Sequence, residues 1–357
     1  MVFEEIHLGG CRSYLIGCEQ SCVAALVDPA LEHCDRYPSL AATRGLRISC
    51  LIDTHTHADH FSALSHLKHR LGVEAIMHRA SPAPFIDVRV EDGETIALGS
   101  LRLRVLHTPG HTLDSMCLVV EGRVLTGDTL LLGSVGRTDL PGGDADALYD
   151  SLVSHLLRLE PGLLVHPAHN YRDTPVSTLG EQGATNPRIA GVTREEFVSR
   201  MRSLDLALPE HLTEALRTNA SGGKPVSQLI HEATRSISFL SMDELQARLE
   251  RSDPGVAVVD VRECHRYAEG HIPRATHIPR GQLELLIDSA FPDPRARILT
   301  YCDWGKVSTL AAATLRTMGF AGAVALDGGF MDWVKEGHPV EVGPPGPPPG
   351  SLGGTHE

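Results

Sequence analysis

Short apolar runs that end in polar loops alternate with amphipathic stretches along the first part of the chain. In residues 101–106 apolar side chains alternate with arginine, and this period of two is typical of a strand with one buried face. A helix is predicted over 144–159, which glycine and proline pairs bound on either side. Buried strands are predicted from three further apolar runs, 22–27, 46–52 and 116–120. The alternation favours an α/β fold.

A second alternation of strands and helices begins near residue 241, beyond a turn-rich stretch at 219–225 that we interpret as the start of a linker. Its predicted elements are strands at 256–261, 298–301 and 324–326 and a helix at 306–318. The expected organisation is therefore a first domain over 1–235, with a helical linker from about 190; a second domain over 236–341; and a disordered glycine- and proline-rich tail over 342–357.

Composition and charge narrow the class of protein. Hydrophobic residues make up 42% of the 357 positions but aromatic residues only 4%, so the cores must depend on aliphatic side chains. A net charge of −13 and the lack of a long Lys/Arg run argue against nucleic-acid binding. No apolar run reaches the roughly 18 residues of a membrane helix, and the start lacks a signal-peptide pattern. We expect a soluble, cytoplasmic protein without a membrane partner.

The eight cysteines include no CxxC pair, which argues against a zinc ribbon or a thioredoxin-like motif. Cys18 and Cys22 are four residues apart and could form a small metal or redox site. We interpret them as small buried or half-buried thiols, in keeping with a reducing compartment.

Four polar segments that follow predicted strands carry side chains able to bind a metal. The segment 54–60 alone contains three histidines and one aspartate. Imidazole and carboxylate groups at strand ends can converge on one cation. A single such segment would be an ordinary surface loop, but four in succession indicate a metal site. Their candidate residues are His55, His57, Asp59 and His60, then His111, then Asp128, and finally His169.

The order of these segments resembles the metallo-β-lactamase superfamily, whose HxHxDH signature is matched by residues 55–60. The resemblance covers residues 1–235 and implies an αββα sandwich. Longer strings resemble the persulfide dioxygenases, relatives of glyoxalase II. These strings are 54–60, 108–112, 126–131, 136–139, 167–171 and 186–188.

This resemblance implies one Fe²⁺ per chain, held by His55, His111 and Asp128. Two imidazoles and one carboxylate leave three positions open on non-haem iron. The implied reaction converts glutathione persulfide and O₂ to glutathione and sulfite. The residues that complete a second metal site in hydrolases of the superfamily are expected here to orient the ligands through hydrogen bonds. They are His57, Asp59, His60 and His169.

Candidates for binding the glutathione part of the substrate follow the metal segments. Arg137 and Arg188 could pair with its carboxylates through bidentate hydrogen bonds. Tyr171 directly follows the His169 loop. Structural hydrogen bonds or plain surface positions would explain all three equally well.

A second candidate site is Cys302, which follows a short apolar strand and precedes an alanine-rich helix. Backbone N–H groups of a tight loop and the helix N-terminus both favour a thiolate over a thiol. The strings 259–263, 270–273, 277–279 and 326–333 surround it in the order seen in rhodaneses. This resemblance covers 236–341 and implies a rhodanese-like α/β domain that transfers sulfane sulfur through a Cys302 persulfide.

The loop departs from the common rhodanese pattern CxxGxRS, because Val307 stands where arginine is usual and Asp303 follows the cysteine. Lys306 is the one cation in the loop. We therefore predict a preference for thiol persulfides over the thiosulfate dianion. Arg262 is expected to support the loop or an anion. The loop residues are Asp303, Trp304, Gly305, Lys306, Val307 and Ser308.

Joined in one chain, the two sites predict an enzyme whose small-molecule partners are glutathione persulfide, glutathione, O₂ and, as a further donor, thiosulfate. One alternative is a dinuclear zinc thioester hydrolase of glyoxalase II type with an appended rhodanese. Another is a non-catalytic sulfide or redox sensor that uses Cys302. A homodimer is one option for the assembly, which the sequence leaves open.

Overall fold

The computed structural model describes residues 1–251 and 255–346. They fall into two compact units, one over Met1–Pro225 and one that begins at Val226. Most of the tail predicted from residue 342 onward lies outside the described residues. No helix in the described part of the chain is long and apolar enough to cross a membrane.

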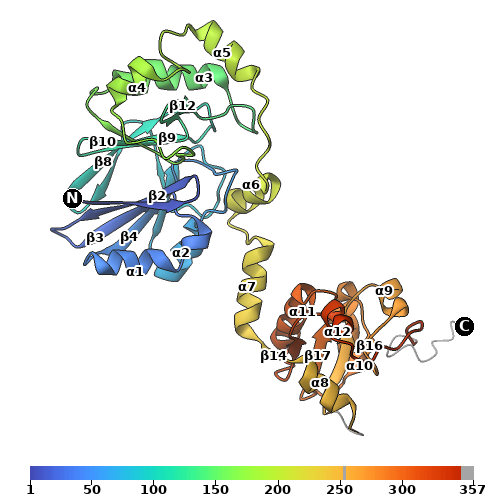
Figure 1. Cartoon of the computed structure of the whole chain (residues 1–357). Helices are drawn as coiled ribbons and strands as arrows, with labels where there is room; N and C mark the ends of the chain where they lie inside the picture. The colour runs from blue at the N-terminus through green and yellow to red at the C-terminus, as the bar shows by residue number, and fades with distance from the viewer. Residues whose placement is uncertain (252–254, 347–357) are drawn as a thin grey trace, which may run out of the picture. The chain divides into compact units, whose positions relative to one another are not determined.

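Two sheets form the centre of the first unit (Figure 1). The first sheet runs in the order β1 (Val2–Leu8), β2 (Cys11–Cys18), β3 (Val23–Val27), β4 (Arg47–Ile52), β5 (Glu74–His78) and β6 (Val88–Val90). The second runs in the order β13 (Leu164–Pro167), β10 (Arg123–Gly127), β9 (Met116–Val120), β8 (Leu101–His107) and β7 (Thr95–Leu98). A small hairpin joins β11 (Leu130–Leu131) to β12 (Ser134–Val135).

Helices cover the outer face of each sheet. Figure 1 shows α1 and α2 against the first sheet and α3, α4 and α5 over the second. The helical segments are η1 (Leu31–His33), α1 (Arg36–Thr43), α2 (Leu64–Leu71), α3 (Ala145–Asp150), η2 (Ser151–His155), η3 (Leu156–Arg158), α4 (Leu179–Thr185), α5 (Arg194–Arg202) and α6 (Leu212–Ser221). The unit is thus an αββα sandwich, which confirms the predicted fold class.

The alternation of side chains along the strands explains this layering. In β8, Leu101, Leu103 and Val105 are buried while Arg102 and Arg104 are exposed, as the period of two predicts. The inward residues meet those of the first sheet in the core between the sheets. A strand such as β3 is buried along most of its length because its other face packs against helices, so its sequence is continuously apolar.

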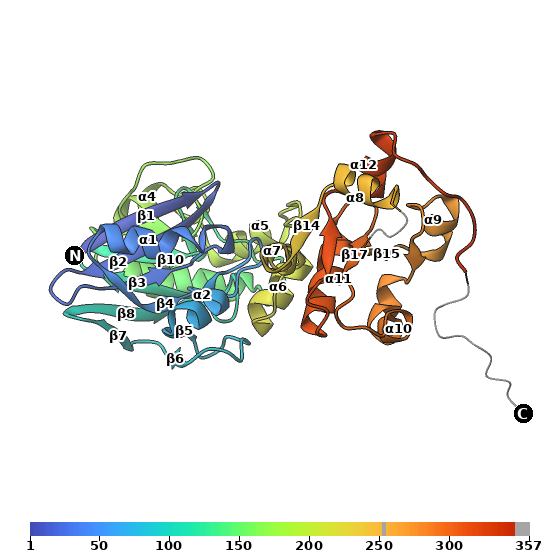
Figure 2. The same ribbon diagram turned by 90° about the horizontal axis from the view of Figure 1, so that it is seen from below.

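The second unit is built on a five-stranded sheet in which each pair of neighbouring strands is parallel. Its strand order is β14 (Ser238–Leu240), β18 (Val324–Leu326), β17 (Ile298–Tyr301), β15 (Ala257–Asp260) and β16 (Thr276–His277). Its helical segments are α7 (Val226–Ser236), α8 (Met242–Leu249), α9 (Cys264–Glu269), η4 (Arg280–Gln282), α10 (Leu283–Ala290), α11 (Lys306–Thr317) and α12 (Phe330–Lys335). Figure 2 shows α8 to α12 around the sheet.

Neighbouring residues of the central strands belong to opposite cores of this unit. Val258 packs with α8, α9 and α12, whereas Val259 packs with α10 and α11. A parallel sheet that is covered on both faces accounts for the apolar runs in its strands. The carboxyl end of β17 leads directly into the loop that carries Cys302, where ligand sites of open α/β sheets lie.

Two predicted segments take a different form in the structure. The helix predicted over 144–159 is divided into α3, the π-helical turn η2 and the 3₁₀ turn η3. The stretch 219–225, interpreted as the start of a linker, begins inside α6. The side chain of Asn219 is tied to the loop after β4, and this tertiary contact overrides the turn-forming character of the sequence.

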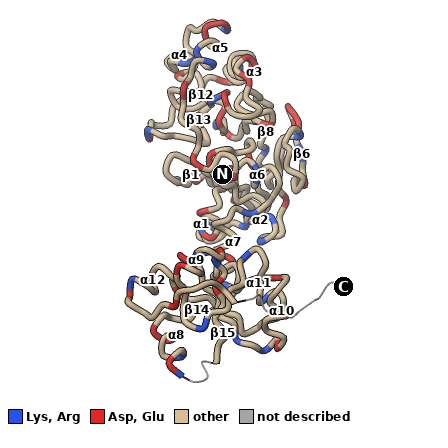
Figure 3. Tube along the Cα trace, turned by 90° about the vertical axis from the view of Figure 1, so that its right-hand side faces the viewer, with Lys and Arg blue, Asp and Glu red and all other residues tan. Residues whose placement is uncertain are grey.

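Charged residues are interleaved over both units. Figure 3 shows Lys and Arg segments alternating with Asp and Glu segments along the described chain. The sequence has 45 Asp and Glu against 32 Lys and Arg, in keeping with its acidic net charge.

We predict that Gly110→Ala destabilises the first unit by about 3 kcal/mol or more, through backbone strain and overpacking. Gly110 has a φ of +137°, and a Cβ there would lie 2.3 Å from the backbone nitrogen of Leu148. Urea unfolding followed by far-ultraviolet circular dichroism measures the loss. The matched control is Gly122→Ala, where φ is +74° and the space is open, so only about 1–2 kcal/mol of left-handed strain applies.

Both tryptophans of the chain, Trp304 and Trp333, belong to the second unit, so their fluorescence reports that unit alone. The tryptophan transition should keep its midpoint in both glycine variants. Equal losses of unfolding free energy in Gly110→Ala and Gly122→Ala would contradict the close contact between Gly110 and α3.

Candidate functional site

The metal-binding segments of the first unit lie on loops that follow strands of both sheets. Residues 53–63 follow β4 of the first sheet, whereas His111 follows β8, Asp128 follows β10 and His169 follows β13 of the second. Because the two sheets pack face to face, the loops at this edge meet although they are far apart in the sequence.

Residues that the motif analysis missed hold the loop after β4 in place. Asn219 in α6 donates hydrogen bonds of 2.9 Å to the carbonyl oxygens of His57 and His60. Asp114 accepts from the backbone N–H and the hydroxyl of Thr56. These residues stand outside any recognisable string, so no local signal in the sequence identifies them.

His55, His111 and Asp128 form the buried group expected to bind the metal. Oδ2 of Asp128 lies 3.6 Å from Nε2 of His111 and 4.0 Å from Nε2 of His55. All three side chains are nearly inaccessible to solvent. The structure therefore brings together two imidazole nitrogens and one carboxylate oxygen from three separate loops.

Hydrogen bonds behind the two imidazoles set which nitrogen faces this group. Nδ1 of His111 donates to the carbonyl oxygen of Arg137 at 2.7 Å. Nδ1 of His55 lies 3.0 Å from the hydroxyl of Thr54, which itself donates to the Asp28 carboxylate. Both rings then carry their proton on Nδ1 and keep the Nε2 lone pair for a metal.

The group fits a divalent metal by its own chemistry. Nε2 of His55 is buried and has no hydrogen-bond partner among the described residues, so a cation would satisfy it. Burial and the neighbouring His57 ring hold the pKa of His55 well below its ordinary value, which keeps the ring neutral. Burial alone would raise the pKa of Asp128, but three nearby histidines lower it on balance, so the carboxylate is ionised.

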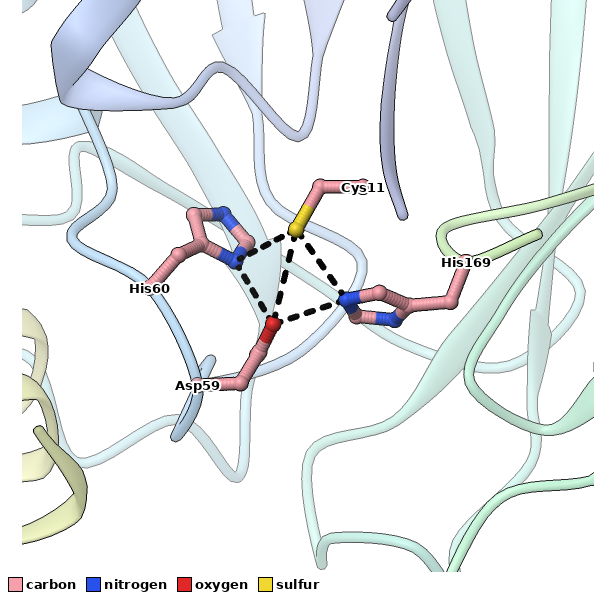
Figure 4. Close-up of side chains that lie close together, drawn as sticks. All are labelled: Cys11, Asp59, His60 and His169. Atoms are coloured by element: carbon pink, nitrogen blue, oxygen red, sulfur yellow. Dashed lines mark hydrogen bonds and ion pairs between the residues drawn. The ribbon is translucent and has the colours of Figure 1, made fainter. Parts of the chain in front are cut away.

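A second group lies next to the first and includes a cysteine that the sequence analysis did not single out. Cys11, Asp59, His60 and His169 each place one potential ligand atom within 4.8 Å of the others (Figure 4). His169 joins the two groups, because its Nδ1 donates to Oδ1 of Asp128 and its Nε2 donates to Oδ2 of Asp59, both at 2.7 Å.

Charge interactions dominate this second group. Although burial opposes it, Asp128 raises the pKa of His169, and Asp59 raises the pKa of His60 to about 10. Burial raises the pKa of Cys11, but hydrogen bonds with His169 and His60 lower it on balance to about 7. In the absence of a metal the cluster therefore pairs protonated rings with the Asp59 carboxylate.

His57 belongs to a third buried group, with Asp28 and Asp53. Its Nε2 lies 3.2 Å from Oδ1 of Asp28, and its Nδ1 has no hydrogen-bond partner among the described residues. Asp28 thus supports both His57 and Thr54, which places it behind two residues of the metal loop.

A cleft of about 700 Å³ opens onto the metal group and contains the residues proposed for the glutathione part of the substrate. Arg137 pairs with Asp139 and donates to the carbonyl oxygens of Leu206 and Ala207, so it has a structural role in this conformation. Tyr171 is exposed and stacks on the ring of His169.

Three further guanidinium groups line the cleft. Those of Arg172, Arg188 and Arg200 form no hydrogen bond or ion pair with the described residues. They leave the mouth of the cleft positively charged in a protein of net charge −13.

The second candidate site is the loop after β17. Sγ of Cys302 accepts a hydrogen bond from the backbone N–H of Ser308 at 3.4 Å and lies 3.5 Å from its hydroxyl. Gly305 adopts a φ of +83° and precedes α11. The cysteine is buried, whereas Trp304 and Val307 are exposed beside it. The loop therefore presents a sheltered sulfur under an apolar rim.

Arg262 supports this loop structurally. Its buried guanidinium donates to both oxygens of Asp260, to the carbonyl oxygen of Gly270 and, at 3.2 Å, to Asp303. Asp303 also pairs with Arg266 at 3.5 Å. The two arginines near Cys302 are thus paired with carboxylates, whereas Lys306 in the same loop has no ion-pair partner among the described residues.

Comparison with known families agrees with both halves of this architecture. The model described as "Metallo-beta-lactamase superfamily" matches residues 8–169, and the one described as "Rhodanese-like domain" matches residues 241–336. The persulfide dioxygenase ETHE1 of Homo sapiens is 36% identical over 214 residues, which are 59% of this chain and 84% of that protein. The chain belongs to the metallo-β-lactamase superfamily. It carries a rhodanese-like domain after the superfamily domain, and this confirms the predicted fusion.

Two solved structures and one further relative are similar to the chain. The crystal structure of ETHE1 from Myxococcus xanthus is 38% identical, covers 63% of this chain and all of that chain, and has a TM-score of 0.61. The metallo-beta-lactamase of Staphylococcus aureus, 22% identical with a TM-score of 0.60, shares the fold over 91% of this chain and 98% of that chain. A hydroxyacylglutathione hydrolase of Anaeromyxobacter dehalogenans is 32% identical over 66% of this chain and 84% of that protein.

We predict that Thr54→Val weakens metal binding by about 10- to 100-fold, the usual cost of removing a hydrogen bond behind a ligand. Valine keeps the shape of threonine but leaves Nδ1–H of His55 without its acceptor. Competition with a chelator measures the dissociation constant. Thr43→Val, which removes an exposed hydroxyl that donates to Leu40, is the control and should bind metal normally. Equal affinity in the two folded variants would show that Thr54 does not orient the ring.

Proposed function

We propose that this protein oxidises glutathione persulfide with O₂ at one iron ion and transfers sulfane sulfur through Cys302. The oxidation consumes one persulfide, one O₂ and one water and yields glutathione and sulfite. The observation that carries the proposal is the grouping of His55, His111 and Asp128 around one position. Such a facial set leaves three positions open on ferrous iron, enough for a sulfur ligand and O₂ together.

The residues around the metal position support a single ion in this group. A ferrous ion held there would supply the redox chemistry that joins O₂ to a persulfide sulfur. The carboxylate of Asp128 that would bridge two ions in a hydrolase has Oδ1 occupied by His169. Nε2 of His57 is likewise occupied by Asp28. The identity of 36% to the ETHE1 persulfide dioxygenases supports the same choice.

The cleft supports an anionic thiol persulfide as the substrate. Arg172, Arg188 and Arg200 can each pair with a carboxylate of a glutathione-like molecule through two hydrogen bonds. Tyr171, stacked on His169 at the same opening, would position the chain of the substrate. Arg137 has a structural role in the cleft wall, because its guanidinium already donates hydrogen bonds to Asp139 and to the carbonyl oxygen of Ala207.

In the rhodanese-like domain the thiolate of Cys302 would attack the terminal sulfur of a donor persulfide. A bond forms between Sγ and that sulfur, the donor's S–S bond breaks, and the donor leaves as a thiolate. Ser308 stabilises the charge on sulfur through its backbone N–H. We assign the oxidation to residues 1–235 and the sulfur transfer to residues 236–341. Because both domains belong to one chain, each is present at a high effective concentration relative to the other.

We predict that His111→Ala lowers persulfide-dependent O₂ uptake by more than about 100-fold, because losing a ligand costs more than losing the hydrogen bond behind one. Iron content should fall from one per chain together with O₂ uptake in an oxygen-electrode assay after anaerobic purification. Sulfur transfer to cyanide or a thiol should continue, because Cys302 lies in the other unit.

The mirror variant Cys302→Ala should keep iron and O₂ uptake and lose sulfur transfer. A native protein that holds a zinc pair and hydrolyses thioesters without taking up O₂ would overturn the dioxygenase and favour the hydrolase. A folded, metal-loaded protein with no turnover of any persulfide would favour a sensor.

We predict that Asp303→Asn raises kcat/KM for thiosulfate about fivefold, since one charge a few ångströms away contributes about 1 kcal/mol in water. The substitution also releases Arg262 and Arg266 from a carboxylate beside Cys302. The increase in kcat/KM should be smaller for a thiol persulfide, because a thiol persulfide carries less negative charge at the reacting sulfur. Asp293→Asn, at an exposed pair with Arg295, is the control. A strong thiosulfate preference in the native protein would contradict the assigned role of Asp303.

A further inference from the structure

The indole of Trp304 is exposed to solvent next to the sheltered sulfur of Cys302. Trp304 is 66% exposed, whereas Cys302 is 5% exposed. The other tryptophan of the chain, Trp333, is fully buried, and its ring nitrogen donates to the carbonyl oxygen of Pro339. An indole left in water contributes little of the apolar burial that stabilises a fold. Packing of the unit therefore does not account for a tryptophan at position 304.

The backbone on both sides of Trp304 is held in place. The N–H of Phe330 donates to the carbonyl oxygen of Cys302 at 2.8 Å. The loop before α12 lies so close that a Cβ on Gly329 would be 2.7 Å from the backbone nitrogen of Trp304. Gly305, which follows Trp304, has a φ of +83° and begins the turn into α11. The indole is thus presented to solvent from a fixed backbone.

The burial of Cys302 divides a donor molecule into a part that enters the loop and a part that stays outside. Only the outer sulfur of the donor must reach Sγ, which the N–H of Ser308 already contacts from within the loop. The rest of the donor must lie over the rim, where Trp304 and Val307 are exposed. Two trans peptide units separate Cys302 from Trp304, so their Cα atoms are at most about 7 Å apart. The indole is therefore within reach of a donor that is in contact with Sγ.

We propose that Trp304 determines the donor specificity of the Cys302 loop by binding the peptide part of a small thiol persulfide of the glutathione type. The amide groups and methylenes of such a peptide cover one face of the indole, and its ammonium group is attracted to the negative face of the ring. Lys306, which has no ion-pair partner among the described residues, supplies a cation for its carboxylates. The inference rests on the proposed sulfur transfer and names the residue that selects its donor.

Thiosulfate differs from this donor in the part that stays outside the loop. Its outer group is small, charged and strongly hydrated, so contact with an indole face does not offset the loss of water. For the peptide, covering on the order of 50 Å² of apolar indole surface corresponds to about tenfold in affinity. Trp304 thus acts on the organic part of the donor, whereas Asp303 acts on the charge of the sulfur group.

Sulfur transfer to cyanide by the full-length protein compares the two donors. Trp304→Ala should lower kcat/KM for glutathione persulfide about tenfold, mainly through a higher KM, and change kcat/KM for thiosulfate by less than about twofold. Trp304→Phe, which keeps a smaller aromatic face, should recover part of the loss. Leu285→Ala is the matched control, because it removes another apolar side chain of the same unit that is 80% exposed.

Tryptophan fluorescence measures binding without turnover. S-Methylglutathione carries the peptide but has no sulfane sulfur to transfer. Both tryptophans of the chain lie in the second unit, so binding in the cleft of the first unit adds no tryptophan signal of its own. We expect saturable quenching in the native protein and none in Trp304→Ala, in which the buried Trp333 remains.

The proposal is overturned if S-methylglutathione leaves the native fluorescence unchanged. It is also overturned if Trp304→Ala, shown to be folded by circular dichroism, loses kcat/KM equally for both donors. Transfer from a protein-bound persulfide but not from glutathione persulfide would overturn it as well. Saturable quenching that depends on Trp304, without sulfur transfer from any donor, would confirm the binding by Trp304 and contradict the proposed transfer.

Discussion

The chemistry of the first unit depends on the proton positions of two buried imidazoles. Thr54 and the Arg137 carbonyl accept from Nδ1 of His55 and His111, so both Nε2 lone pairs face the Asp128 carboxylate. A ring protonated on the other nitrogen would direct an N–H at the cation and repel it. The burial that keeps His55 neutral also prevents water from satisfying its Nε2. The site is therefore oriented for a metal by its surroundings as much as by its ligands.

The sandwich makes this orientation possible because the two sheets contribute complementary parts of one edge. The loop after β4 comes from the first sheet, whereas the loops after β8, β10 and β13 come from the second. His169 connects the groups by donating to Asp128 with one nitrogen and to Asp59 with the other.

The charged groups differ between the cleft of the first unit and the Cys302 loop of the second. The cleft of the first unit contains three guanidinium groups that have no partner among the described residues. Around Cys302 the arginines are instead neutralised by Asp260 and Asp303. The first unit thus has unpaired arginines beside its metal group, whereas the arginines near Cys302 are held by carboxylates.

The sequence by itself determined the two α/β folds, the histidine and aspartate ligand candidates and Cys302. These features could be predicted because hydrophobic periodicity and short motifs depend on residues that are close together in the sequence. It gave no indication of Cys11, Asn219 or Asp28, whose neighbours carry no pattern. Only the tertiary structure placed Cys11 against His169 and moved Asn219 from an expected linker into a helix that holds the metal loop. It also placed the guanidinium of Arg137 in a hydrogen bond with the Asp139 carboxylate. Such contacts join residues up to about 160 positions apart, and chain packing rather than local sequence decides which of them meet.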